Sequence, residues 1–228
     1  MAHAENPLPE ILSGHNDSGA VASAPHLAFV GLPFVGHQHA HGNVLGLAIV
    51  FPSGSPLEAP LAKAVQKFED QGGRLDGDGV RLTLRRLRPA ELVSAPQSIY
   101  PHRWNRAATT WRTVTPIALP RHPGNLSRGT AERREKSWSE AESIVRLACT
   151  HIGLPAPTSI SLQLEPFFNG SRHIAAFPPF IQGNQRRMLL HAELLFPNPV
   201  HGPLIIGSGR FRGLGLCLPV NTPGHGNG

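Results

Sequence analysis

Apolar runs and alternating residues in the first half of the chain predict three strands and one helix. Residues 26–35 and 44–51 are rich in β-branched and aromatic side chains, which is typical of strands. Apolar residues recur at helical spacing over 57–68, and Gly72–Gly73 ends that pattern. Alternation over 80–85 predicts a third strand with arginines on its polar face, and the residues that follow are expected to be irregular.

The second half of the chain predicts a strand, a helix and three more strands, in that order. Ser137 and Glu140 have the spacing of a capping box, so the helix is expected to begin there and to end before Gly153. Residues 121–136 carry many charges without an apolar pattern, which predicts a mobile basic loop. The strands are predicted over residues 111–119, 159–167, 188–196 and 214–218.

The order of elements in the second half is close to the β-α-β-β-α-β order of a ferredoxin-like fold with a shortened second helix. The first half matches that order more loosely. We therefore expect an α+β protein with two tandem ferredoxin-like (RRM-like) modules and a C-terminal glycine-rich loop. The expected divisions are a flexible arm over residues 1–24, a first module over 25–110 and a second module over 111–228.

The charge of the chain favours a polyanionic partner. The formal net charge is +6, and 18 of the 21 basic residues are arginine. Guanidinium groups donate in a forked geometry that matches phosphate, and they stack on unpaired bases. A genome rich in G and C would also favour arginine over lysine, so the bias alone does not decide the partner.

The cysteines and the apolar runs bear on the compartment. Cys149 and Cys217 lack the spacing of a metal site and are expected to be buried, reduced thiols. Neither an export signal nor an apolar run long enough for a membrane span is evident in the sequence. We expect a cytoplasmic protein that does not bind membranes.

A glycine-rich segment over residues 207–215 is the first candidate binding site. Glycines allow close backbone approach, and successive N–H groups together with Arg210 and Arg212 could hold a phosphate backbone. The segment lacks the lysine and hydroxyl residue of a nucleotide-binding P-loop and precedes a strand. The simpler alternative is a surface turn with solvated arginines.

Histidines in the turn between the first two predicted strands form the second candidate site. His37, His39 and His41 alternate along the chain, and imidazole exchanges protons near neutral pH. The three side chains suit general acid–base catalysis, but they could also coordinate a metal ion or serve only the structure of the loop.

Four segments of the sequence resemble a family of CRISPR proteins. The glycine-rich segment resembles the C-terminal loop of the repeat-associated RNA-binding (RAMP) superfamily, which builds tandem ferredoxin-like folds. Residues Leu12–His15, 25–39 and Arg112–Pro116 are similar to the processing half of the fused backbone-and-endoribonuclease subunit of type I-U (also called I-G) systems. The resemblance covers most of residues 12–219.

This resemblance implies a metal-independent endoribonuclease that needs no cofactor and cuts precursor RNA within CRISPR repeats. The ribose 2′-OH attacks the adjacent phosphate, and the enzyme keeps the repeat-derived handle of the guide RNA. The implied partners are repeat RNA and other subunits of a CRISPR effector complex. A backbone subunit that binds guide RNA without cutting it is the alternative.

The resemblance also implies roles for individual residues. His37 is favoured as the general base and His39 as the acid or a second base, with His41 and His15 as further candidates, although the sequence does not determine the order of these roles. The expected RNA-binding residues are Gly207, Gly209, Arg210, Arg212, Gly213, Gly215, Arg121, His122, Arg186 and Arg187.

Overall fold

The computed structural model describes residues 27–51, 58–77 and 79–220. The expected arm over 1–24, with His15, lies outside the described residues. The chain groups into two compact units, one containing residues 51–96 and the other containing 27–50 together with 97–220. Residues 25–110 were expected to form one module. In the structure, residues 27–50 instead group with the second half of the chain.

The smaller unit consists of a helix, a hairpin and a single helical turn. Its elements are α2 (Glu58–Asp70), β3 (Arg74–Gly77), β4 (Val80–Thr83) and α3 (Pro89–Leu92). Strands β3 and β4 pair as an antiparallel hairpin, in which Leu75 lies opposite Leu82. The helix and β4 confirm the pattern in the sequence, whereas β3 was not expected.

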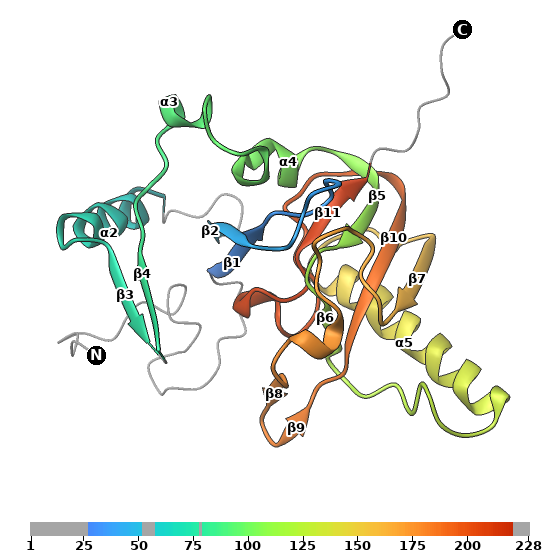
Figure 1. Cartoon of the computed structure of the whole chain (residues 1–228). Coiled ribbons are helices and arrows are strands. Elements are labelled where there is room, and N and C mark those ends of the chain that lie inside the picture. Colours follow the sequence, from blue (N-terminus) through green and yellow to red (C-terminus); the bar gives the residue numbers. More distant parts are fainter. Residues whose placement is uncertain (1–26, 52–57, 78, 221–228) are drawn as a thin grey trace, which may run out of the picture. The chain divides into compact units, whose positions relative to one another are not determined.

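An antiparallel sheet of five strands forms the centre of the larger unit (Figure 1). Its strands are β5 (Ala108–Thr113), β6 (Ile117–Ala118), β7 (Ser159–Gln163), β10 (Leu189–Val200) and β11 (Cys217–Val220). Strand β10 pairs with β5 and β6 along one edge and with β7 along the other, and β11 pairs with the outer edge of β5. The single strand expected over 111–119 is therefore two strands separated by a bend.

Helix α5 (Ala131–His151) packs its apolar side on one face of this sheet. Ile144, Val145 and Cys149 join Trp111 and Leu194 in the largest buried cluster. Burial raises the pKa of the Cys149 thiol to about 12, so this thiol stays protonated. Both cysteines are free and buried, as expected.

The beginning of α5 corrects the prediction for residues 121–136. Thr130 is the N-cap, its hydroxyl accepting from the N–H of Arg133, and the helix already includes residues 131–136. Ser137 is not a cap; its hydroxyl donates to the carbonyl of Arg133 inside the helix at 3.0 Å. The first turns of α5 are mostly exposed, so they carry no apolar pattern that sequence analysis could detect.

A hairpin of β1 (Ala28–Pro33) and β2 (Val44–Val50) belongs to a second buried cluster. In this cluster Val30 and Leu32 pack with Leu216 and Leu218, whereas Cys217 belongs to the cluster beneath α5. Because neighbouring residues of a strand point to opposite faces, this second cluster lies on the other face of the sheet.

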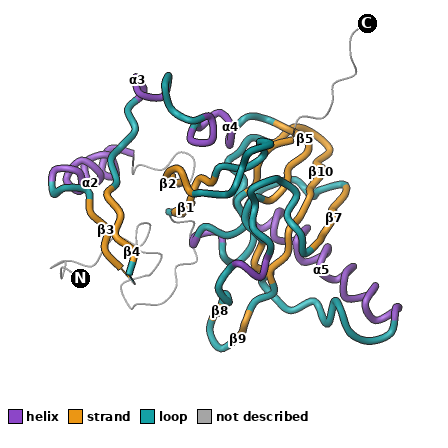
Figure 2. Tube along the Cα trace, in the orientation of Figure 1, coloured by secondary structure: helices purple, strands orange, loops and turns teal. Residues whose placement is uncertain are grey.

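Short elements complete the larger unit (Figure 2). They are η1 (Gln97–Ile99), α4 (Pro101–Asn105), η2 (Ile174–Ala176), β8 (Ile181–Gln182), β9 (Gln185–Arg186) and η3 (Arg210–Arg212). Strands β8 and β9 pair as a separate small hairpin. The protein is thus of the α+β class, as expected. In the described parts of the chain, no helix is both long and apolar enough to cross a membrane.

Gly215 tests how strongly the turn before β11 depends on glycine. Its φ is +76°, and a Cβ there would overlap the carbonyl oxygen of Ile206. Gly153 has a φ of +82° but no atom near its Cβ position. We expect Gly153→Ala to cost about 1 kcal/mol of left-handed strain, and Gly215→Ala to cost at least about 2 kcal/mol more because backbone must move. Chemical denaturation measures both, and equal losses would contradict this explanation.

Candidate functional site

The histidine loop, residues 34–43, connects β1 to β2 and is closed by its own backbone. The N–H of Gly42 donates to the carbonyl of Phe34 at 3.0 Å, and the N–H of Phe34 donates to the carbonyl of Asn43 at 2.8 Å. Inside the loop, the N–H of Ala40 donates to the carbonyl of His37 at 2.9 Å. The positions of the histidines are therefore set by a hydrogen-bonded turn.

A second turn, residues 168–172, supports the histidine loop from outside. The N–H of Gly36 donates to the carbonyl of Asn169 at 2.9 Å. Gly42 and Gly170 pack backbone to backbone, because a Cβ on Gly42 would overlap the Gly170 carbonyl and one on Gly170 would lie 2.7 Å from the Phe34 oxygen. Both glycines also have positive φ, so no other residue suits this contact.

Arg103, on α4, holds the start of the histidine loop. Its guanidinium donates to the carbonyl of Val35 at 2.6 Å. Burial and, after it, the charge of Arg106 lower the pKa of Arg103, although an arginine remains protonated at neutral pH. Arg103 lies in the stretch that the sequence predicts to be irregular, so its role in supporting the loop was not predicted.

Two imidazoles of the loop contact the ring of Phe34, and the third lies beside one of them. The ring of His37 stacks on Phe34 with 5.6 Å between centroids, and the ring of His41 meets Phe34 at a steep angle at 5.7 Å. The rings of His37 and His39 are 5.5 Å apart. All three histidines are exposed, so two imidazoles could reach oxygens of one bound phosphodiester.

Hydrogen bonds distinguish the nitrogens of His37 from those of His39. The N–H of His39 donates to Nδ1 of His37 at 3.2 Å, which leaves the proton of a neutral His37 on Nε2. The amide nitrogen of Gln38 lies 3.1 Å from Nε2 of His39 and donates to it, so that nitrogen carries a lone pair. In these contacts His37 presents a donor and His39 presents an acceptor.

Arg172 is a cation beside the loop that the sequence analysis missed. Its Nε lies 3.4 Å from the position that a Cβ on Gly42 would occupy, and the residue is exposed. The carbonyl of Arg172 faces Nε2 of His191 at 3.0 Å. Only a long-range contact brings this arginine to the histidines, so no local motif could have indicated it.

His191 is a buried histidine on β10 and has a structural role. The carbonyl of Arg172 can only accept, so a neutral His191 carries its proton on Nε2, and its Nδ1 accepts from the hydroxyl of Thr113 at 3.1 Å. The same hydroxyl accepts from the N–H of Ala192 at 2.9 Å. The Nε2–H of His191 then donates to the carbonyl of Arg172. Burial lowers the pKa of His191, which keeps this neutral tautomer. In the sequence, the signal that could have identified His191 was a polar residue inside an otherwise apolar strand.

The glycines at 207, 209 and 215 are buried and pack against the chain itself. A Cβ on Gly207 would lie 2.6 Å from the Ala118 oxygen, and one on Gly209 would lie 2.8 Å from Leu214. The N–H of Ser208 donates to Ala118, and that of Gly215 donates to Pro116, both at 2.9 Å. The close approach that these glycines permit is therefore intramolecular, and these two N–H groups are already used.

The arginines of the same segment differ in exposure. Arg210 is half-buried, donates to the carbonyl of Gly207 at 3.3 Å and lies 4.3 Å from the centroid of Phe211. Burial lowers its pKa. Arg212 is exposed and lies 5.8 Å from the centroid of Phe180. Gly213, with φ +78°, ends the short helix η3 that carries both.

The structure does not bring these arginines to the histidine loop. Gly213 lies beside the carbonyl of Phe29, near the start of β1, whereas the histidine loop begins after the end of that strand. At about 3.3 Å per residue, the five residues from Phe29 to Phe34 span roughly 16 Å. The two candidate sites are therefore separate regions of the larger unit.

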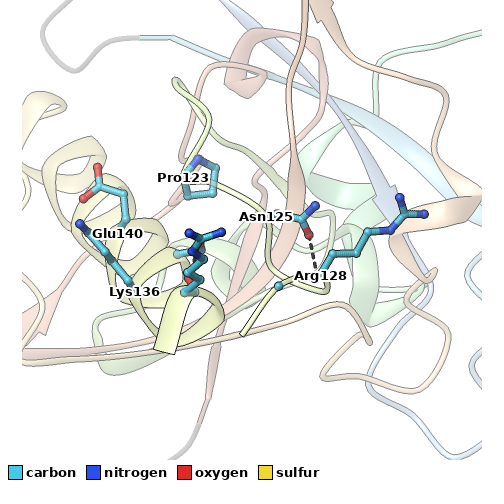
Figure 3. Close-up of a pocket in the computed structure, with 8 residues that line it drawn as sticks. Pro123, Asn125, Arg128, Lys136 and Glu140 are labelled. Atoms are coloured by element: carbon cyan, nitrogen blue, oxygen red, sulfur yellow. Dashed lines mark hydrogen bonds between the residues drawn. The ribbon is translucent and has the colours of Figure 1, made fainter. Parts of the chain in front are cut away.

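The remaining expected RNA-binding residues lie near two hollows that share the loop before α5. Arg121 pairs with Glu140, near the middle of α5, at 2.5 Å. Arg128, Arg133 and Lys136 line a hollow of about 500 Å³ (Figure 3). The larger hollow, about 760 Å³, is lined by residues that include His122, Arg186 and Arg187.

The described residues contain no group of three or more His, Cys, Asp or Glu side chains placed to hold a metal ion. The fold and these surfaces define a basic α+β protein with exposed imidazoles on one loop and exposed cations around its hollows. Residues 2–219 match the model of a family described as CRISPR-associated protein, GSU0054 family, and the chain belongs to that family. The CRISPR association expected from the sequence is thus confirmed. Comparisons with curated proteins and with solved structures give no match.

His191 predicts a component of the pH dependence of stability. Its folded-state pKa lies below the unfolded value of about 6.5. As pH falls below that value the unfolded chain takes up a proton that the folded chain refuses, so stability is lost. We expect His191→Gln to reduce the loss of unfolding free energy between pH 7.5 and pH 5, measured by chemical denaturation.

The exposed His201 provides the matched control. His201→Gln should lose as much unfolding free energy between pH 7.5 and pH 5 as the wild type does. If His191→Gln loses as much unfolding free energy between pH 7.5 and pH 5 as the wild type does, the role given to this histidine is contradicted.

Proposed function

We propose that this protein is the endoribonuclease that processes CRISPR precursor RNA. It cuts within repeats without a metal ion and retains the repeat-derived handle. The observation that carries the proposal is the cluster of three exposed imidazoles on a tightly held loop, in a member of a CRISPR-associated family. RNA contains its own nucleophile, the 2′-OH, so proton transfer and charge stabilisation suffice for cleavage.

The contacts within the loop favour particular roles. His39 takes the proton from the 2′-OH through Nε2, the nitrogen that accepts from Gln38 in the absence of RNA. His37 donates through Nε2–H to the phosphate, because its Nδ1 is occupied by the N–H of His39. This reverses the sequence-based preference for His37 as base. His41, the other imidazole in contact with Phe34, is the candidate that protonates the departing 5′-oxygen.

Positive charge next to the loop supports the same chemistry. The phosphorane that forms during attack carries more charge than the phosphodiester, and a nearby guanidinium stabilises that additional charge. Arg172 is the exposed cation beside Gly42, and its backbone is tied to the sheet through His191. We assign Arg172 to the phosphate of the scissile bond.

The order of strands supports a ferredoxin-like second module of the RAMP type. In the order β11–β5–β10–β7, with α5 between β5 and β7 in sequence, each strand is antiparallel to its neighbour. This is the arrangement expected for a β-α-β-β-α-β chain whose second helix is short. Among the described residues of the first half, β1–β2 and β3–β4 are separate sheets, so this support is limited to the second module.

A guide-RNA-binding backbone subunit without catalytic activity is the second candidate. The observation that favours it is the distance along β1 between the histidine loop and Arg210 and Arg212. In that case the exposed cations hold RNA alongside other subunits of an effector complex, and the histidines serve only the loop.

His39→Ala tests the catalytic proposal. We expect the rate of cleavage of a labelled RNA that carries one repeat of the host's CRISPR array to fall by about 10²- to 10⁴-fold in the presence of EDTA. Binding of the same RNA should change little. His201→Ala, at an exposed position outside the loop, should cleave at the wild-type rate.

Two results would contradict this prediction in different ways. Tight binding of repeat RNA by the wild type without any cleavage would favour the backbone subunit. Cleavage by His39→Ala at the wild-type rate would move the catalytic centre away from the histidine loop.

Arg212→Gln tests the RNA contact of the segment over 207–215. Arg212 is exposed and free to contact phosphate, whereas Arg210 is half-buried. Loss of one phosphate contact should reduce the slope of log affinity against log salt by about 0.7. Arg74→Gln, an exposed arginine on β3, is the control for net charge. An Arg212→Gln slope equal to that of the wild type would remove Arg212 from the interface.

A further inference from the structure

The larger hollow, called the aromatic cavity below, has a volume of about 760 Å³. It lies between the loop before α5, the segment around η2 and the beginning of β10, all within the larger unit. Small-molecule and cofactor sites usually have volumes of roughly 300–1,000 Å³ and mainly apolar walls. The cavity therefore has room for one nucleotide.

Aromatic side chains form much of its wall. Trp138 reaches it from α5, and Phe177 and Phe180 reach it from the segment after η2. Each of the three is only partly buried, so part of each ring is open to the cavity. Aromatic faces stack on unpaired bases of any sequence and contribute about 1–3 kcal/mol per base.

Arg187 supplies an unsatisfied donor at the same cavity. Its NH1 donates to the side chain of Gln185 at 3.2 Å, and its backbone N–H donates to the carbonyl of Phe180 at 2.8 Å. The Nε of its guanidinium is buried and has no hydrogen-bond partner. Buried donors are normally paired, and this nitrogen gains a partner if the side chain turns toward a ligand oxygen in the cavity. A phosphate oxygen fits the charge and the forked geometry of the guanidinium.

The cavity lining also contains two imidazoles, those of His122 and His173. Nδ1 of His122 accepts from the N–H of Gly124 at 3.0 Å, and Nδ1 of His173 accepts from the N–H of Ala175 at 3.1 Å. Each neutral ring therefore carries its proton on Nε2. Nε2 of His173 lies 3.6 Å from a carboxylate oxygen of Glu165.

We propose that the aromatic cavity binds one unstacked nucleotide of the RNA. The base stacks on the aromatic wall, and its phosphate is held by Arg187. The exposed Arg212, over Phe180, lies where the neighbouring phosphate of the same strand leaves the cavity. This inference rests on the proposed function for its ligand, but it does not depend on which histidine cuts the RNA.

The test combines a protein variant with RNAs that each lack one base. A set of repeat RNAs with a single abasic nucleotide at successive positions is bound to the wild type and to Phe177→Leu. In the wild type, loss of the base at one position should weaken binding about 5- to 100-fold. In Phe177→Leu the same loss should weaken binding less than it does in the wild type, because part of the stacking face is already absent.

Two further variants show whether a change in binding comes from the cavity or from a folding defect in Phe177→Leu. Arg187→Gln lies on a partly exposed segment and should weaken binding of the intact RNA several-fold and reduce the same abasic penalty. Phe167→Leu changes a partly buried aromatic residue that does not line the cavity and should keep the wild-type pattern.

The possible failures are distinguishable. Suppose that the wild type binds and cuts repeat RNA, but that each abasic position weakens binding by the same factor in the wild type, Phe177→Leu and Arg187→Gln. The cavity is then not a nucleotide site, and the proposed function stands. If the wild type does not bind repeat RNA, both the cavity assignment and the proposed function are wrong.

Discussion

The histidine loop depends on one close backbone contact. Gly42 and Gly170 approach so closely that neither position has room for a side chain. This contact joins the histidine loop to the turn over 168–172, and the carbonyl of Arg172 at the end of that turn accepts from buried His191. The loop is thus connected to the central strand of the sheet through a buried, neutral histidine. An exposed cluster of imidazoles gains a defined position from a rigid core.

The functional surfaces are divided between two regions of the larger unit. The histidine loop follows β1, whereas the arginines of η3 lie near the beginning of the same strand. The aromatic cavity lies on the side of these arginines, because Arg212 stacks over Phe180 of its wall. Binding and cutting would then depend on different side chains, which separates their effects in mutants.

Local patterns in the sequence indicated much of the fold. Apolar spacing identified α2 and the buried side of α5, and alternation identified β7. The first turn of α5 was missed because it is exposed, and β3 was missed because its four residues are all exposed. The short helices near Trp104 were missed as well, since long-range packing of that ring holds them in place.

The candidate site was predictable only where its residues are close in the chain. His37, His39 and His41 stand out because they alternate in a single turn. Arg172 could not be found in this way, because it comes to the loop from 130 residues further along. The wall of the aromatic cavity likewise comes from segments between 122 and 189. The glycines over 207–215 were recognised, but their close contacts are with the chain itself.

The most direct test of the account is the cleavage of an RNA with one ribose changed. The repeat RNA carries a 2′-deoxyribose immediately before the cut site and is otherwise unchanged. The account predicts that the modified RNA binds but stays intact, while the normal RNA yields one product with a cyclic phosphate and another with a 5′-hydroxyl. Cleavage of the modified RNA at the normal rate would contradict the proposed attack by the 2′-OH.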